Sequence, residues 1–127
     1  MRYETQKLIN IYNEHSVIIV GCDFDDTVYP FTNNKFIEDR CEVVKALLIE
    51  LRDHIKICLY TVSDPETLQY KSHIMRLYGL DPDFINDSPV GPWKDSKKLF
   101  FNILLDDKAG LNETIEILTE FKDYLLK

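Results

Sequence analysis

Apolar residues recur along the chain in two patterns, as short continuous runs and at intervals of three or four positions. The runs predict strands buried within a sheet, because Val, Ile and aromatic side chains favour extended backbone; they cover 17–20, 55–60 and 100–105. The wider spacing predicts helices over 3–14, 36–53, 64–78 and from a cap at Asn112 to the end, and Phe84–Ile85 is a candidate very short strand. Asp64 before Pro65 suits the start of a helix, and Gly79 suits its end.

Helices and strands alternate in this pattern, so that helices rather than tight turns separate the main strands. Strands joined by helical crossovers pair in parallel, almost always with right-handed connections. The sequence therefore predicts the α/β class, as a three-layer Rossmann-like fold with a parallel sheet of about four strands and helices on both faces. The chain has 127 residues and contains no repeat, low-complexity tract or linker, so we expect a single domain over 1–127.

Polar residues follow three of the predicted strands at the point where each strand ends. Three aspartates lie within 23–26, Thr61 follows the second run, and an acidic pair at 106–107 follows the third. Because the carboxyl ends of parallel strands share one edge of the sheet, we expect these residues to converge there. Carboxylates that cannot separate raise one another's pKa unless a cation lies among them. The sequence therefore predicts a metal or phosphate site at this edge.

The composition narrows the range of partners. Acidic residues number 22 against 15 basic ones, a net charge of −7, which argues against extended nucleic-acid binding because phosphate backbones are bound by clustered Lys and Arg. No apolar run approaches the roughly 20 residues needed to span a bilayer, and no signal peptide is visible, so we expect no membrane association. The three cysteines are an odd number and two lie within apolar runs, which favours reduced thiols and a cytoplasmic protein.

Mg²⁺ is the cation that this ligand chemistry suits. It takes oxygen ligands, keeps several waters, and is usually held by one or two carboxylates together with a substrate phosphate. Thr61 offers a hydroxyl, and Lys94, Lys97 and Lys98 offer ammonium groups, at positions from which they could reach that phosphate. A carboxylate can also act as the nucleophile in phosphoryl transfer and form an aspartyl phosphate.

The motifs at the strand ends resemble those of a known family. The segment 23–27, D-F-D-D-T after an apolar strand, resembles the first motif of the haloacid dehalogenase superfamily, D-x-D-x-T. The pair 60–61, Y-T, resembles the second motif, a Ser or Thr after an apolar run. The segment 103–107, I-L-L-D-D, resembles the fourth motif, an apolar strand that ends in an acidic pair. The resemblance covers roughly residues 16–111.

The third motif of that family is a single lysine, and a single residue is harder to identify in a sequence than the other three motifs. Lys98 is our first choice, because it directly precedes the strand that carries the acidic pair; Lys94 is second and Lys97 third. By the resemblance, Thr61 and this lysine would hold the phosphoryl oxygens of the substrate.

The resemblance also implies roles for the aspartates. Asp23 would attack phosphorus and become the aspartyl phosphate, and Asp25 would protonate the leaving group and then activate water. Asp23, the backbone carbonyl of Asp25, and Asp106 would bind Mg²⁺, with Asp107 either a further ligand or a neighbour of the ligands. Phosphatases of the family keep the second Asp of the first motif, so Asp25 favours a phosphomonoester phosphatase.

Members of the family often carry a cap domain after the first or second motif. Here only residues 28–35 separate the first motif from the next predicted helix, so we expect a capless member. An open site would suit a macromolecular phosphoester, or a lid supplied by a second copy in a homo-oligomer. The aromatic residues Tyr29, Phe31, Tyr60 and Trp93 are candidates to line its mouth. The class of the phosphorylated substrate stays open.

The acidic cluster also allows comparison with other classes of protein. A non-catalytic binding or regulatory protein of the same fold would keep the same site, and phosphotransfer or nucleotidase activity also stays open. A receiver domain would carry its phosphorylated Asp at the end of a middle strand, where this chain has Thr61. A calcium loop beginning at Asp23 would need Gly and Glu where Val28 and Asn34 stand. No Cys has an Arg six residues later, which excludes a cysteine phosphatase.

Overall fold

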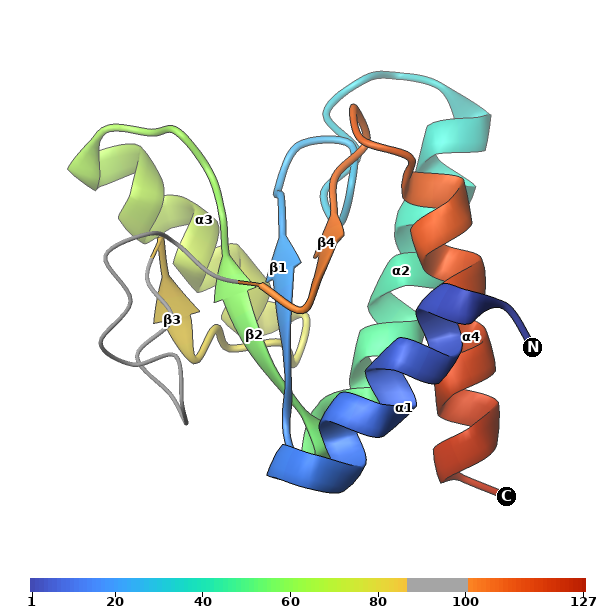
Figure 1. Cartoon of the computed structure of the whole chain (residues 1–127). Helices are drawn as coiled ribbons and strands as arrows, with labels where there is room; N and C mark the ends of the chain where they lie inside the picture. Colours follow the sequence, from blue (N-terminus) through green and yellow to red (C-terminus); the bar gives the residue numbers. More distant parts are fainter. Residues whose placement is uncertain (87–100) are drawn as a thin grey trace.

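The computed structural model describes residues 1–86 and 101–127 (Figure 1). In these ranges four strands form one sheet in the order β3-β2-β1-β4, and every pairing is parallel. The strands are β1 (Ile18–Cys22), β2 (Ile55–Leu59), β3 (Phe84–Ile85) and β4 (Ile103–Leu105). The helices are α1 (Tyr3–His15), α2 (Lys35–Leu51), the 3₁₀ turn η1 (Arg52–His54), α3 (Pro65–Leu77) and α4 (Leu111–Leu125). The predicted α/β class and the four-stranded parallel sheet are confirmed.

β1 is a central strand, and the apolar sequence of its segment explains why. All five of its residues are buried. It pairs with β2 from Ile18 opposite Ile55 to Cys22 opposite Leu59, and with β4 at its C-terminal half. A strand that is covered on both faces needs apolar side chains in both directions. In Figure 1, α3 lies near β3, whereas α1, α2 and α4 lie toward β4.

One hydrophobic core joins the sheet to the helices. Its buried members include Ile18 and Val20 of β1, Ile57 and Leu59 of β2, Val44 and Leu48 of α2, Met75 of α3, and Leu118 and Phe121 of α4. Burial of one such side chain contributes about 1.5–3 kcal/mol, so the core rather than the acidic edge stabilises the fold. Within the described ranges, no helix has the length and apolar character needed to cross a membrane.

Helix α3 begins and ends as its sequence predicts. The Asp64 side chain accepts a hydrogen bond of 2.8 Å from the backbone N–H of Thr67, and Pro65 occupies the first turn. At the other end Gly79 has a φ of 81°, a left-handed conformation that costs glycine little. The backbone N–H of Leu80 then donates to the Met75 carbonyl at 2.9 Å. These contacts define where α3 begins after β2 and where it ends.

Two predicted boundaries were wrong. Helix α4 begins at Leu111 with Gly110 as its N-cap, not at Asn112, because Gly110 takes a φ of 67° and thereby brings the buried Leu111 into the first turn. Strand β4 is shorter than the apolar run that predicted it and begins at Ile103. Just before it, the Asn102 backbone N–H donates to the Ile19 carbonyl at 2.9 Å, and the Asn102 side chain accepts a hydrogen bond of 2.6 Å from the backbone N–H of Ile19.

Candidate functional site

The carboxyl ends of β1, β2 and β4 lie along one edge of the sheet, as parallel pairing requires (Figure 1). Backbone hydrogen bonds extend the pairing past the strands. The N–H of Asp23 donates to the Leu105 carbonyl at 2.8 Å, and the N–H of Tyr60 donates to the Cys22 carbonyl at 2.9 Å. The first residue after β1 and the first after β2 are therefore held in place by the sheet itself, and the predicted convergence of the three polar segments is observed.

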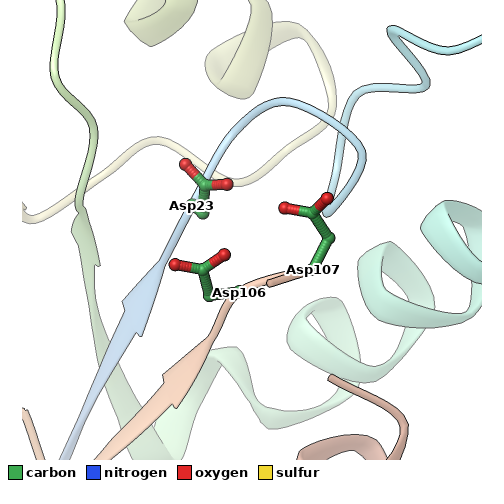
Figure 2. Close-up of side chains that lie close together, drawn as sticks. All are labelled: Asp23, Asp106 and Asp107. Carbon is green, nitrogen blue, oxygen red and sulfur yellow. The ribbon is translucent and has the colours of Figure 1, made fainter. Parts of the chain in front are cut away.

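Three carboxylates form a compact group at this edge. Asp23 follows β1, and Asp106 and Asp107 follow β4; one oxygen from each lies within 4.8 Å of the others (Figure 2). Thr27, which is fully buried, accepts a hydrogen bond of 3.1 Å from the backbone N–H of Asp107. This bond joins the loop after β1 to the loop after β4 and keeps the acidic pair beside Asp23.

The electrostatics of this group favour a cation. Burial raises the pKa of Asp23 to about 6, against a hydrogen bond from the Phe24 backbone that lowers it. The charges of Asp106, Asp107 and Asp25 add to the rise. Burial, followed by the charge of Asp106, also raises the pKa of Asp107. All three grouped side chains offer carboxylate oxygens, which are the ligands that a hard divalent cation such as Mg²⁺ prefers. The residues therefore fit such an ion.

A second polar group faces the carboxylates from the end of β2. Thr61 is buried, and its hydroxyl accepts a hydrogen bond of 3.0 Å from the ammonium of Lys71 in α3. The same ammonium lies 3.7 Å from a carboxylate oxygen of Asp25 and 5.4 Å from the centre of the Phe24 ring. The Ser63 hydroxyl lies 3.3 Å from that of Thr61. The site thus contains a buried cation beside a hydroxyl.

Lys71 was not predicted from the sequence, which pointed to Lys98, Lys94 and Lys97. Those three lysines lie outside the described residues. The signal for Lys71 was its position in the buried stripe of α3, four residues before Met75. A lysine is rarely buried without a partner, so a lysine at a buried position of a helix indicates a polar partner in the segment that the helix packs against.

Asn86 holds the backbone that carries Thr61. Its side-chain oxygen accepts a hydrogen bond of 3.0 Å from the Thr61 N–H, and its amide donates one of 2.9 Å to the Thr61 carbonyl. Asn86 has a φ of 51°, so its backbone is in the left-handed region. An asparagine tolerates this conformation better than most residues and supplies both hydrogen bonds. Asn86 therefore orients Thr61, although it belongs neither to the three grouped carboxylates nor to the pair of Thr61 and Lys71.

Asp25 and Asp26 differ in their surroundings. The Asp25 side chain is about half exposed and approaches Lys71. Asp26 has a φ of 59°, and its carboxylate accepts hydrogen bonds from the Thr32 backbone at 2.8 Å and the Thr32 hydroxyl at 2.6 Å. Although burial opposes the effect, the bonds from Thr32 lower the pKa of Asp26. Asp26 therefore shapes the loop after β1, whereas Asp25 faces the centre of the site.

These groups surround one cavity of about 530 Å³. Its polar lining comes from Asp23, Asp25, Asp26, Thr32, Thr61, Lys71, Asp106, Asp107 and Lys108. Its apolar lining comes from Phe31, Tyr60 and Val62. Phe31 and Tyr60 were predicted to line the mouth of the site. Tyr29 was also predicted there, but its ring instead stacks on that of Phe24, with ring centres 5.1 Å apart. Trp93 lies outside the described residues. The cavity can accommodate a small anion held between the acidic group and Lys71, provided that a cation accompanies it.

The chain is distantly similar to a solved structure. No model of a protein family matches the chain, and no curated protein matches it in sequence. Among solved structures, it is similar to the crystal structure of yhjK, a haloacid dehalogenase-like hydrolase protein from Bacillus subtilis, with 26% sequence identity and a TM-score of 0.34. The match covers 63% of this chain and 32% of that one, so this chain spans about a third of the matched structure's length. The function has to be inferred from the side chains at the sheet edge.

Proposed function

We propose that the chain is a Mg²⁺-dependent phosphomonoester phosphatase that works through an aspartyl phosphate on Asp23. The observation that carries the proposal is the pairing of two groups in one cavity. The carboxylates of Asp23, Asp106 and Asp107 lie within 4.8 Å of one another, and Lys71 with Thr61 lines the same cavity. An acidic cluster alone would suit many cations, but a buried ammonium beside it suits a phosphoryl group that shares the cation.

The metal would be held by the Asp23 and Asp106 carboxylates and the Asp25 backbone carbonyl, with Asp107 a further ligand or a neighbour. A bound Mg²⁺ supplies charge neutralisation, which lets an anionic nucleophile approach an anionic phosphoryl group. Lys71 and Thr61 would bind the phosphoryl oxygens. In this proposal Lys71 takes the part that the sequence assigned to Lys98, because its ammonium is already 3.0 Å from the Thr61 hydroxyl.

The reaction would proceed in two steps. A carboxylate oxygen of Asp23 forms a bond to phosphorus as the bond to the ester oxygen breaks, and Asp25 gives its proton to the departing alcohol. Asp25 then takes a proton from a water molecule, which attacks the same phosphorus. The bond from Asp23 to phosphorus breaks, inorganic phosphate leaves, and both carboxylates return to their starting state.

Phosphate release from a generic aryl phosphate and a panel of metabolites tests the proposal. The wild-type protein should release phosphate with Mg²⁺ and not with EDTA, and Asp23→Asn should abolish release. Asp53→Asn, in η1 and outside the cavity, serves as a matched control and should keep full activity. Release that persists in EDTA or in Asp23→Asn would refute the mechanism. Mg²⁺ binding without turnover on any ester would instead favour a non-catalytic binding protein.

A further inference from the structure

The mouth of the site contains apolar side chains that are not part of the hydrophobic core. Phe31, Tyr60 and Val62 line the same cavity as Asp23 and Lys71, with exposed fractions of 72%, 37% and 99%. A single exposed apolar residue is ordinary on a protein surface. Three that share one cavity with a group of polar residues are typical of a binding site, where apolar walls surround a few polar anchors.

Both aromatic rings are carried by fixed backbone. The N–H of Phe31 donates to the Tyr29 carbonyl at 2.9 Å, and the next residue, Thr32, is bound twice by the Asp26 carboxylate. Tyr60 packs edge to face against Phe101, with ring centres 5.3 Å apart and planes at 71°. The Tyr60 ring, which is already packed in this way, would lose little conformational entropy when a ligand covers it. The Tyr60 side of the mouth is therefore preorganised for an apolar or aromatic group, and the Phe31 side offers a ring on a fixed backbone.

The charges around the cavity limit what else a substrate can carry. Within residues 1–86 and 101–127, the side chains that line it include five acidic groups and two ammonium groups, those of Lys71 and Lys108. With Asp25 protonated, as its part as general acid requires, one bound divalent cation and the two ammonium groups balance the four remaining carboxylates. The phosphoryl group of the substrate would already add negative charge and would use the cation and Lys71, so a second anionic group would add charge that these described residues do not balance. Contacts between like charges weaken binding and so discriminate against such ligands.

From these observations we infer that the site takes phosphate monoesters of small uncharged alcohols that carry an aromatic ring. The ring would rest against Phe31, Tyr60 and Val62 while the phosphoryl group reaches Asp23. This inference rests on the proposed phosphatase function and adds its substrate class. Bisphosphates, nucleoside di- and triphosphates and acidic phosphopeptides would be poor substrates, because they bring extra negative charge into the same cavity.

The test compares benzyl phosphate with ethyl phosphate. Both esters release primary alcohols, so their chemical steps are nearly matched, and a difference in rate between them reports the contribution of the ring. We expect kcat/KM to be about 5- to 10-fold higher for the benzyl ester, the size of one good aromatic contact. Phe31→Ala should bring this ratio close to one. Phe36→Ala removes an exposed ring on α2 outside the cavity and should leave the ratio unchanged. A 4-carboxybenzyl phosphate should lose the advantage of the ring, because of its added charge.

Binding of the stable phosphonates separates this inference from the phosphatase proposal. Calorimetry with Mg²⁺ should show tighter binding of benzylphosphonate than of ethylphosphonate, and Phe31→Ala should abolish the difference. That result would support the substrate class even if no ester is hydrolysed. Equal hydrolysis of the two esters together with equal binding of the two phosphonates would overturn the inference and leave the phosphatase proposal standing. Binding of neither phosphonate would overturn it as well.

Discussion

Replacement of Lys71 by Met tests the buried cation of the site. Met keeps the length of the side chain and removes its charge. The ammonium lies 3.0 Å from the Thr61 hydroxyl and 3.7 Å from Asp25, so in the proposed reaction it contacts the phosphoryl group as charge moves onto the leaving oxygen. Loss of one preorganised electrostatic contact of this kind costs about 10²–10³ in kcat. We expect Lys71→Met to lower phosphate release by that factor.

Stability should change much less than activity. The ion pair between Lys71 and the half-exposed Asp25 contributes about 1 kcal/mol or less, and Met avoids the cost of burying an ammonium. We therefore expect the free energy of unfolding, measured in urea, to change by less than about 1 kcal/mol.

Lys45→Met is the matched control. Lys45 is a similarly buried lysine, with a side chain 14% exposed against 11% for Lys71. Its ammonium pairs with Glu42 at 2.6 Å and lies 4.2 Å from the centre of the Tyr78 ring, away from the cavity. This variant should keep wild-type turnover. Wild-type turnover in Lys71→Met, or an equal loss in both variants, would refute the role given to Lys71.

Three further predictions concern the residues that support the site. Asn86→Ala should lower the free energy of unfolding by about 1–3 kcal/mol and lower turnover severalfold, because two hydrogen bonds to Thr61 are lost; unchanged urea unfolding would contradict this. Gly21→Ala should destabilise the protein by about 1–3 kcal/mol, since a Cβ there would lie 2.5 Å from the Phe101 ring, and Phe101→Leu in the same chain should recover part of the loss. A hydrogen bond from the Thr67 backbone lowers the pKa of Asp64 below its usual 3.8. The stability that this bond provides is present above pH 3.8 and lost as pH falls through the lower folded-state pKa, so acid unfolding curves should differ between wild type and Asp64→Ala mainly above that range.

The sequence predicted that the acidic groups share one edge of the sheet because this depends on strand direction alone. Each apolar run ends directly at its polar residues, so parallel strands place Asp23 and Asp106 at the same edge; the pairing of β1 with β4, which the structure shows, then makes them neighbours. The start of α3 was equally predictable, because Asp64 caps the helix through a contact only three residues away. Features that depend on local contacts, or on the direction of strands, can be inferred without coordinates.

Lys71 could not be found in this way because its role depends on the rotation of α3 against the sheet. Helical periodicity gives the spacing of a buried stripe but not what lies beneath each of its positions. The N-cap of α4 was missed for a related reason. Asn112 is a good capping residue, but burial of Leu111 required the helix to begin earlier, and Gly110 supplied the left-handed backbone. Tertiary packing outweighed local preference at both places.

The most direct test of the central claim is the mass of the protein after acid quench. Asp25→Asn should be incubated with Mg²⁺ and p-nitrophenyl phosphate, whose leaving group departs without a proton from the enzyme. Without Asp25 to activate water, the aspartyl phosphate should accumulate. We predict a shift of one phosphoryl group, lost in hydroxylamine and located to the peptide that contains Asp23, and no shift when Asp23→Asn is added. Steady phosphate release with no adduct, or an adduct on any other residue, would contradict the account.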